Sequence, residues 1–305
     1  MKFSVVIPLY NKEKYILDCV RSVLNQTLPP SEVLVINDGS TDKSSEVLSS
    51  IKSPLVKIFN QKNHGLSATR NRGVKLSNES LVAFLDADDQ WHPDFLLNIG
   101  NLQKKFPEAS IYGTSYYDVI KQKNVPAKHS IPEKFKGKGI IATSFFEYNY
   151  NHFIPNMSTL CIKKNDFPEK VFNTSIDYHE DVDFFLRHVS NLKVALLLSP
   201  LAYINTNWND RMSNSVLNNK RLPDLSTFEN HYKNNKEAIK FINQQKLKYL
   251  IKSKINNDYA NIIRYKSMIN LSHLSLKKKI LIYIPNKVLL KLMKLKRLVR
   301  SWFVA

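Results

Sequence analysis

The chain has few cysteines and no recognisable signal peptide, two features that would point to a particular class of protein. Only two cysteines, Cys19 and Cys161, occur among its 305 residues, too few for a disulfide framework or a cysteine-based zinc cluster. Both lie among apolar residues, as ordinary buried thiols do, so a reducing compartment is expected. The first residues form a short apolar run that ends at Pro8, with no small-residue cleavage site. No signal peptide is therefore predicted, and we expect a cytoplasmic protein.

Long hydrophobic runs are also lacking. No uninterrupted apolar stretch approaches the roughly 18–20 residues that a membrane-spanning helix needs. Hydrophobic residues nevertheless make up 43% of the chain, which is ample for a packed core. The length suits one large α/β domain with an appendage, or two modest domains. A folded protein without a membrane-spanning helix is predicted.

Acidic residues are absent from residue 259 to the C-terminus, where basic residues are frequent. These basic residues account for more than half of the formal net charge of +19. A charge this large usually indicates a polyanionic partner, either nucleic acid or an anionic membrane. We find no helix-turn-helix, no zinc-ligand spacing and no aromatic–basic repeat, so nucleic-acid binding is not predicted. The basic residues are Arg264, Lys266, Lys277, Lys278, Lys279, Lys287, Lys291, Lys294, Lys296, Arg297 and Arg300.

The end of the chain, residues 286–303, has the pattern of an amphipathic helix. Its apolar residues recur at intervals of four and three, and basic residues flank them. Such a helix, ending in Trp302 and Phe303, is typical of a segment that lies in the surface of an anionic leaflet. The alternative is a helix whose apolar stripe packs on the folded domain while its lysines face water. The stripe comprises Val288, Leu292, Leu295, Val299 and Trp302.

Short β-branched runs alternate with helical patterns in the first ninety residues. This alternation is typical of βαβ units and predicts an α/β fold with a Rossmann-like, mostly parallel sheet flanked by helices. Farther along, residues 225–242 and 247–269 have the composition of helices and predict a helical C-terminal extension. In the first ninety residues, strands are expected at 3–9, 33–36, 55–59 and 81–85, and helices at 15–24, 44–51 and 67–76.

Polar side chains follow all four predicted strands, and ligands of such sheets bind beyond the carboxyl ends of the strands. The fourth strand ends in three carboxylates, Asp86, Asp88 and Asp89. Crowded carboxylates repel one another unless they share a cation, so this pattern suggests Mg²⁺ or Mn²⁺ holding a nucleotide's phosphates. The alternative is a solvated acidic turn in which an aspartate caps a helix that begins near Pro93.

Five strings occur in a characteristic order along the first 215 residues: VVIPLYNKEKYI, VLVINDGSTDKS, NHGLSATRNRG, VAFLDADDQWHPD and HEDVDFFLR. In this order and at these distances they resemble the family 2 glycosyltransferases, inverting enzymes of the GT-A fold. Any one string is a weak signal, whereas five in order are strong. The resemblance implies a GT-A nucleotide-sugar glycosyltransferase domain over residues 1–215 and leaves residues 216–305 as a basic helical C-terminal region.

The resemblance implies roles for residues at three of the strand ends. Pro8 and Tyr10 would lie beside the nucleotide base, and Asp38 would accept a hydrogen bond from its edge. Gly65 permits an unusual backbone conformation, and Arg70 in the following helix would approach a phosphate oxygen. Structural alternatives exist for each: a strand end with a surface tyrosine, a tight turn, and a solvated helix residue.

The two acidic motifs complete the site that the resemblance implies. Asp88 is assigned to the metal, expected to be Mn²⁺ or Mg²⁺, and Asp86 to the ribose and phosphates. Glu180 and Asp181 match the family's Glu-Asp pair, whose aspartate is the general base that takes a proton from the acceptor hydroxyl. From the residues alone, an acidic first turn that favours the helix dipole is the better explanation of the pair, and the resemblance reverses that preference.

Two other segments bear on the acceptor and the phosphates. Residues 151–164 resemble the family's segment that flanks the acceptor. Residues 209–215, NDRMSNS, are the nearest match to a basic or hydroxyl-rich strip that many relatives carry. The usual Tyr-Arg pair is absent, because Ile204 follows Tyr203.

The sequence thus predicts a metal-dependent, inverting glycosyltransferase. Its donor would be a nucleotide-sugar, with UDP as the expected nucleotide, and its acceptor a hydroxyl of a growing bacterial surface glycan or of a lipid-linked oligosaccharide. Two alternatives are a polyprenyl-phosphate glycosyltransferase and a non-catalytic nucleotide-sugar-binding module. The C-terminal helix would hold the enzyme peripherally on the inner face of the cell membrane.

Overall fold

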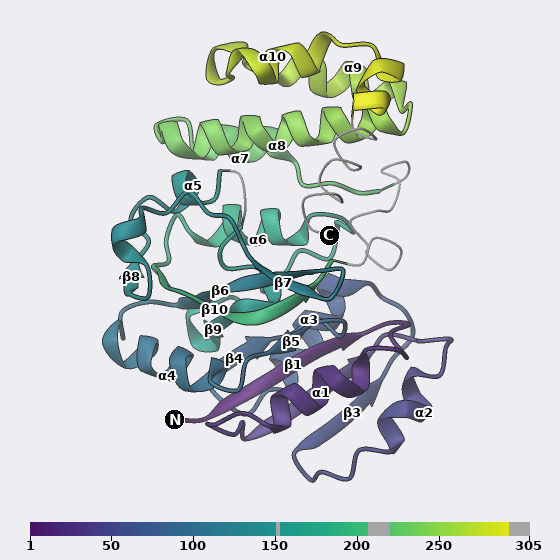
Figure 1. The fold of residues 1–305 in the computed structure, drawn as a ribbon, viewed down its shortest axis with the longest axis vertical. Coiled ribbons are helices and arrows are strands. Elements are labelled where there is room, and N and C mark those ends of the chain that lie inside the picture. The colour runs from purple at the N-terminus through teal and green to yellow at the C-terminus, as the bar shows by residue number, and fades with distance from the viewer. Residues whose placement is uncertain (151–152, 207–219, 293–305) are drawn as a thin grey trace. The chain divides into compact units, whose positions relative to one another are not determined.

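A computed structural model describes residues 1–150, 153–206 and 220–292 (Figure 1). The chain divides into two compact units, Met1–Thr206 and Asn207–Ala305. The first is an α/β unit and the second is helical. The sequence placed the end of the α/β domain at residue 215, within a stretch outside the described residues.

One ten-stranded mixed sheet forms the centre of the first unit. Eight of its strands follow the order β3-β2-β1-β4-β9-β6-β10-β5, while β7 pairs with β6 and β8 with β10. In its first half, β1, β2, β3 and β4 are parallel. In its second half, β9 runs antiparallel between β4 and β6, while β6 and β10 are parallel to each other. The strands are β1 (Phe3–Leu9), β2 (Glu32–Asn37), β3 (Val56–Asn60), β4 (Leu81–Phe84), β5 (Gln90–Trp91), β6 (Ile111–Ile120), β7 (Lys123–Pro126), β8 (Gly139–Ile141), β9 (Leu160–Lys163) and β10 (Val194–Asn205).

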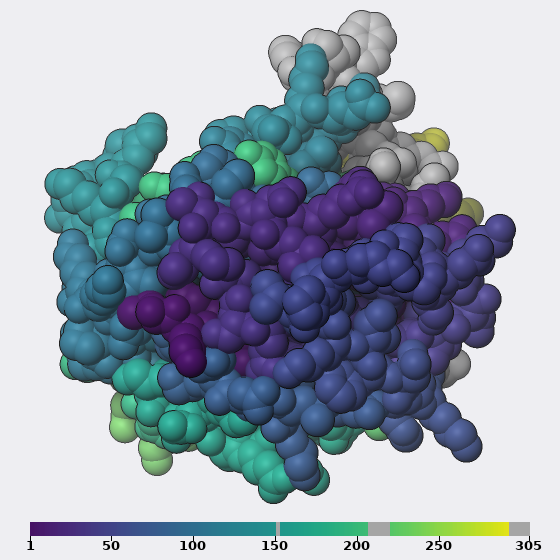
Figure 2. Space-filling model, turned by 90° about the horizontal axis from the view of Figure 1, so that it is seen from below, coloured from purple at the N-terminus to yellow at the C-terminus, as the bar shows by residue number. Residues whose placement is uncertain are grey.

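Helices cover both faces of this sheet in Figure 1, as expected for a doubly wound α/β unit. Every residue of β1, β2 and β4 is buried, which explains why these strands are almost uniformly apolar. The purple and blue N-terminal part of the chain forms much of the face seen in Figure 2. The helices of this unit are α1 (Ile16–Leu24), α2 (Ser44–Ser49), α3 (Leu66–Leu76), α4 (Phe95–Lys105), α5 (Phe145–Tyr148) and α6 (Glu180–His188).

Close packing of α3 on β1 fixes the helix that carries Arg70. A Cβ atom at Gly73 would lie 2.3 Å from a methyl carbon of Val6, so only glycine allows this approach. Farther along, the short 3-10 helices Met157–Thr159 and Lys164–Asp166 flank β9. The predicted fold class is confirmed, and each strand and helix predicted in the first ninety residues is present within two residues of its expected ends.

The second unit consists of α7 (Leu225–His231), α8 (Lys236–Ile255), α9 (Tyr259–Met268) and α10 (Leu276–Tyr283), with a further helix beginning at residue 286. The two long helices predicted here were wrong in their boundaries. Asn235 and Asp258 start new helices, since their side chains accept hydrogen bonds from the backbone N–H groups of Ala238 and Asn261. No helix within the described ranges is both long and apolar enough to cross a bilayer.

Two buried lysines of α8 join the helices of the second unit. The Lys246 ammonium donates to a carboxylate oxygen of Glu229 at 2.6 Å and to the carbonyl of Met268 at 3.1 Å. The Lys254 ammonium donates to the carbonyls of Leu281, Ile282 and Ile284 at the C-terminal end of α10. A cation at this end satisfies orphan carbonyls and complements the helix dipole.

Candidate functional site

The carboxyl ends of β1, β2 and β4 bring the predicted donor-binding residues to one edge of the sheet. Pro8 is buried in β1, and pairing with β4 stops just before it, at Val6 and Phe84. Pairing with β2 continues to Leu9. Because proline has no N–H to donate to a neighbouring strand, the chain that follows β4 is free to leave the sheet beside Pro8. This release starts the acidic turn at residues 86–89.

Asp38 is buried at the end of β2 and holds the loop that leads into α3. One carboxylate oxygen accepts from Gln61 Nε2 at 2.6 Å and from the backbone N–H of His64 at 2.8 Å. The other accepts from the N–H of Gly65 at 2.9 Å. Gly65 has φ +86°, which favours glycine, and a Cβ there would meet open space. Asp38 therefore has a structural role in ordering the loop, in addition to its predicted contact with a base.

Tyr10 lies 47% exposed on the loop after β1, with its ring available to a ligand. The next residue, Asn11, has φ +51° and its N–H donates to Ser40 Oγ at 3.0 Å. Its side-chain oxygen accepts from the N–H of Thr41 at 2.7 Å. These bonds fasten the Tyr10 loop to the loop after Asp38, so the two predicted base-binding residues lie on connected segments.

Arg70 and Asp86 form a largely buried ion pair. Arg70 Nη2 donates to Asp86 Oδ1 at 2.6 Å, and the Arg70 side chain is only 2% exposed. The guanidinium also lies over the ring of Phe172, 5.6 Å from its centroid. Its Nε is buried and makes no hydrogen bond within the described part of the chain. In this pair the Asp86 carboxylate is partly exposed and the Arg70 guanidinium is buried. The positive charge of Arg70 can therefore act on an anion that binds at this edge of the sheet.

Asp88, the predicted metal ligand, is already paired with a cation of the chain. Its Oδ2 accepts from Lys12 Nζ at 2.7 Å. Lys12 belongs to the loop after β1, two residues beyond Tyr10, and its own N–H donates to Ser44 Oγ at 2.9 Å. No local pattern in the sequence singles out Lys12, because only the fold brings it to Asp88.

Asp89 is buried and has a structural role. Its carboxylate accepts from Ser158 Oγ and from the N–H of Asn205 at 2.8 Å. The same Ser158 hydroxyl accepts from the N–H of Asp86 at 3.1 Å. Burial, reinforced by the charges of Asp88 and Asp86, raises the pKa of Asp89 well above its ordinary value. Asp94, and not Asp89, occupies the N-cap position of the helix that follows, and its side chain makes no capping hydrogen bond. The alternative of an aspartate of the turn capping this helix therefore does not apply to Asp89.

Glu180 and Asp181 begin α6, and electrostatics tie them to the donor-side cluster. Burial raises the pKa of Glu180, the nearby Arg70 opposes this rise, and the charges of Asp181 and Asp86 add to it. Arg70, Asp86 and Glu180 therefore act on one another directly. Asp181 is only partly buried, and its Oδ1 accepts from the N–H of Val182 at 2.8 Å.

Two features hold this end of α6 in place. His179, which precedes the helix, has φ +59°, a strained conformation for a residue other than glycine. Its ring stacks on Tyr178 at 4.3 Å, where burial and the charges of Asp181 and Glu180 raise the tyrosine's pKa to about 12. Upstream, Asn71 of α3 exchanges two hydrogen bonds of 2.8 Å with the backbone of Phe172. The segment leading to α6 is thereby fixed to the helix that carries Arg70.

The carboxylates of this site can bind a divalent cation only if a bound ligand supplies further oxygen atoms. No group of three or more His, Cys, Asp or Glu side chains in the described ranges is arranged to hold a metal. Asp88 offers one carboxylate oxygen beside the one bonded to Lys12. Mg²⁺ commonly takes one or two protein carboxylates and fills its remaining positions with water and substrate phosphates. The residues present suit this mode of binding.

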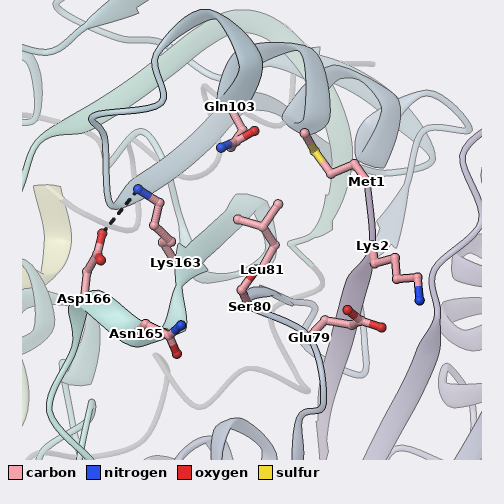
Figure 3. A pocket seen from close by; sticks show the side chains of 9 residues that line it. All are labelled: Met1, Lys2, Glu79, Ser80, Leu81, Gln103, Lys163, Asn165 and Asp166. Atoms are coloured by element: carbon pink, nitrogen blue, oxygen red, sulfur yellow. Dashed lines mark ion pairs between the residues drawn. The ribbon is translucent and has the colours of Figure 1, made fainter.

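A cavity of about 500 Å³ lies at the other edge of the sheet (Figure 3). The cavity lies near the start of β1, the start of β4 and the end of β9. The residues that line it include Met1, Leu81 and Lys163. Lys163 is paired with Asp166 at 3.6 Å. None of the predicted site residues lines this cavity. Of the other predicted segments, residues 209–215 lie outside the described residues.

Comparison with known proteins agrees with this geometry. Residues 4–167, more than half of the chain, match the model of the family described as "Glycosyl transferase family 2". Glycosyltransferase GlyA of Streptococcus pneumoniae is 33% identical over 153 residues, which are 49% of this chain and 22% of GlyA. Chondroitin synthase of Escherichia coli is 26% identical over 249 residues, 81% of this chain and 34% of that protein. The chain thus spans only about a fifth to a third of the length of these relatives.

Among solved structures, Staphylococcus aureus TarS (residues 1–349) in complex with UDP-GlcNAc superposes with a TM-score of 0.58 at 20% identity. The superposition covers 81% of this chain and 67% of that chain. It supports the mixed sheet with flanking helices as a GT-A fold. The match of the family model to more than half of the sequence, on a fold that brings the motifs together at one edge of a sheet, shows that this chain belongs to glycosyl transferase family 2.

Proposed function

We propose that the chain transfers a sugar, with inversion, from a nucleotide diphosphate sugar to a hydroxyl of a bacterial surface glycan or lipid-linked oligosaccharide. UDP is the expected nucleotide. One observation carries this proposal: the buried Arg70–Asp86 pair and the Glu180–Asp181 helix start act on each other at one site. A module that only bound a nucleotide-sugar would have no use for the second carboxylate pair.

The donor half of the proposal rests on the loops after β1 and β2. The exposed ring of Tyr10 can stack on a base, and Asp38 lies on the connected loop, where its carboxylate orders Gly65. Arg70 keeps its charge buried beside Asp86. There it can stabilise the negative charge that accumulates on the departing diphosphate, because a buried cation acts through a low dielectric.

The acceptor half rests on the different environments of the two α6 carboxylates. Asp181 is the more accessible and stands in the first turn, where the helix dipole favours an anion. Its carboxylate can therefore accept the proton of an acceptor hydroxyl as that oxygen attacks the sugar. Glu180 is buried, so its carboxylate orients the site and faces the Arg70 charge. One displacement opposite the leaving phosphate inverts the anomeric carbon.

A divalent cation, Mn²⁺ or Mg²⁺, would be held by Asp88 together with the donor's phosphates. When bound, it would supply positive charge to the leaving diphosphate. The chain itself holds Arg70 and Asp88 near each other, because Arg70 pairs with Asp86. The Asp89 carboxylate is bonded to the Ser158 hydroxyl and does not take part.

Calorimetric titration with UDP, GDP and TDP, each with and without Mn²⁺, followed by a product assay with the corresponding nucleotide-sugars, tests this function. We expect metal-dependent binding of UDP and transfer that releases UDP in step with an inverted product. Binding of no nucleotide would overturn the proposal. Binding with neither transfer nor donor hydrolysis would favour a binding module instead.

The second unit supplies an observation in favour of membrane association. On α10, Leu276, Ile280 and Tyr283 recur at helical spacing and are 75%, 53% and 60% exposed. The ammonium of Lys266, on α9, lies 5.2 Å from the Tyr283 ring. With no acidic residue beyond 258, this apolar and basic face complements an anionic lipid surface. We propose that α9 and α10 contact such a surface. The predicted helix at 286–303 is present over residues 286–292, and the rest lies outside the described residues.

Sedimentation with vesicles tests this association. The full chain should sediment with anionic vesicles and not with zwitterionic ones, and its binding should weaken as salt rises. The double variant Leu276→Ser with Ile280→Ser should lose most of the binding that persists at high salt. Equal binding of the variant and the parent protein would exclude the α10 face as the contact.

A further inference from the structure

The pairing of Lys12 with Asp88 places a cation of the chain on the predicted metal ligand. Lys12 Nζ and Asp88 Oδ2 are 2.7 Å apart, and both side chains are mostly buried, at 18% and 17% exposed. The Lys12 ammonium also lies 6.0 Å from the centre of the Tyr15 ring. A cation that binds Asp88 must share the carboxylate with this ammonium or displace it.

The backbone of Lys12 is fixed, so only its side chain can respond. The Lys12 N–H donates to Ser44 Oγ at 2.9 Å, and the N–H of Glu13 donates to Asp42 at 2.9 Å. The preceding Asn11 is held in a left-handed conformation by its bonds to the loop after β2. The lysine side chain, by contrast, is a flexible four-carbon stem that ends in a compact charge.

A divalent ion on Asp88 and the Lys12 ammonium repel each other strongly at such short range. If no other anion is close, the ammonium stays on Asp88 and disfavours the ion. A diphosphate bound beside Tyr10, on the same loop as Lys12, would offer the ammonium a second anionic partner. Lysine is well suited to such phosphate contacts.

We propose that Lys12 is a positioning residue that makes divalent-cation binding depend on the donor's diphosphate. Without nucleotide, the Lys12–Asp88 pair closes the metal position. With nucleotide, the ammonium moves to a phosphate oxygen and frees Asp88 for the cation. The inference rests on the proposed function, and linkage requires the coupling to be reciprocal, so the cation strengthens nucleotide binding by the same factor.

A purely structural ion pair gives a different expectation. In that case Lys12 and Asp88 would remain together in every state, and removing the ammonium would leave a buried carboxylate with no partner. The folded protein would lose stability, while the ratio of cation affinities with and without nucleotide would not change. The coupling between the two ligands therefore distinguishes the alternatives.

The experiment measures free Mn²⁺ by electron paramagnetic resonance in titrations of the full chain, with and without saturating UDP. The variants are Lys12→Met, which removes the charge, and Lys12→Arg, which keeps it. Lys14→Met is the matched control, because Lys14 is an exposed lysine of the same loop. In the parent protein, UDP should increase Mn²⁺ affinity by at least about fivefold, within the usual range of coupling between sites.

In Lys12→Met, Mn²⁺ alone should bind at least about fivefold more tightly than in the parent protein, and the enhancement by UDP should shrink by a similar factor. Lys12→Arg and Lys14→Met should keep the parent's coupling. Unchanged affinity for Mn²⁺ alone in a Lys12→Met protein that is folded by circular dichroism would overturn the inference while leaving the proposed function intact. Failure of the parent protein to bind UDP under any condition would instead overturn the proposed function.

Discussion

Both units of this chain bury ionisable side chains, but the surroundings of those side chains differ. In the second unit, the Lys246 ammonium meets a carboxylate and a carbonyl, and the Lys254 ammonium meets three carbonyls. In the first unit, burial and the nearby carboxylates of Asp181 and Asp86 raise the pKa of Glu180, while Arg70 opposes the rise. A buried charge with enough partners joins elements of the fold, whereas carboxylates left with too little positive charge are poised to receive it from a ligand.

This difference predicts opposite effects of mutation in the two units. Removing Asp88, Glu180 or Asp181 from the first unit should reduce activity and leave stability equal or higher. Removing a lysine from the second should reduce stability and leave the chemistry of the first unit unchanged. The following substitutions test the contrast.

The largest effect is expected from Asp181→Asn. The substitution keeps the shape of the side chain and removes its basicity, so transfer should fall by about 10² to 10⁴-fold, as is typical for lost general-base catalysis. Donor binding should change little. A product assay and UDP calorimetry measure the two quantities, with the exposed Glu169→Gln as control. Near-normal turnover would assign the base to Glu180 or to another residue.

Asp88→Ala should remove the metal-dependent part of nucleotide binding. We expect at least about a tenfold loss of UDP affinity in the presence of Mn²⁺, in line with the loss of an interaction with a charged group. Affinity without Mn²⁺ should not fall. Calorimetry under both conditions decides the matter, and Glu46→Ala, an exposed acidic residue of α2, provides the control. Equal Mn²⁺-supported affinity in variant and parent would remove Asp88 from the metal site.

Lys254→Met in the second unit should act on stability. Methionine fills similar space and cannot donate to the three carbonyls at the end of α10, so the helical unit should lose about 2–3 kcal/mol. Hydrogen exchange of peptides from α8 and α10 in the full chain measures this loss. The exposed Lys240→Met on the same helix should stay within about 0.5 kcal/mol of the parent. Equal protection in the two variants would show that the buried ammonium does not join these helices.

The smallest effect, of opposite sign, is expected from Glu180→Gln. The folded pKa of Glu180 lies above its ordinary value of 4.5, so the folded state holds the proton more tightly than the unfolded state does. Stability therefore falls as pH rises from 4.5 through the raised pKa. The glutamine variant avoids this loss and should gain about 0.5–2 kcal/mol near neutral pH.

Thermal unfolding of the parent protein and of Glu180→Gln at several pH values checks that sign. The gain should vanish below pH 4.5, where the carboxyl is protonated in both states. A gain that persists at low pH would have a cause other than charge. A loss near neutral pH would mean that Arg70 stabilises the Glu180 carboxylate more than burial destabilises it.

The sequence predicted the parallel half of the sheet well, because the signals there are local. The buried β-branched runs of β1, β2 and β4 and the polar turns after them mark each boundary. The second unit was less predictable in detail, since its helices share one Lys- and Asn-rich composition. The breaks before Asn235 and Asp258 depend on single capping residues within apparently continuous helical patterns.

The sequence allowed candidate site residues to be named, but it did not reveal the contacts that those residues make. Asp38, Arg70, Asp86 and Glu180 stand out because their motifs are recognisable. The partners that define their environments, Lys12 above all, have ordinary local surroundings in the sequence. The contact between Lys12 and Asp88 joins two strand ends that are far apart along the chain, and the register of the sheet determines it.

Ser158 has a consequence for protein engineering. Its hydroxyl accepts a hydrogen bond from the N–H of Asp86 and donates one to the carboxylate of Asp89. Its backbone carbonyl accepts a hydrogen bond from the indole N–H of Trp91 at 2.6 Å. Ser158 lies in the middle of residues 151–164, the segment that resembles the acceptor-flanking part of the family. A chimaera that exchanges this segment to alter acceptor choice and loses the hydroxyl would remove the hydrogen bonds that Ser158 makes to the Asp86 N–H and to one oxygen of the buried Asp89 carboxylate. Residue 158 is therefore the point at which any such graft has to retain the original serine.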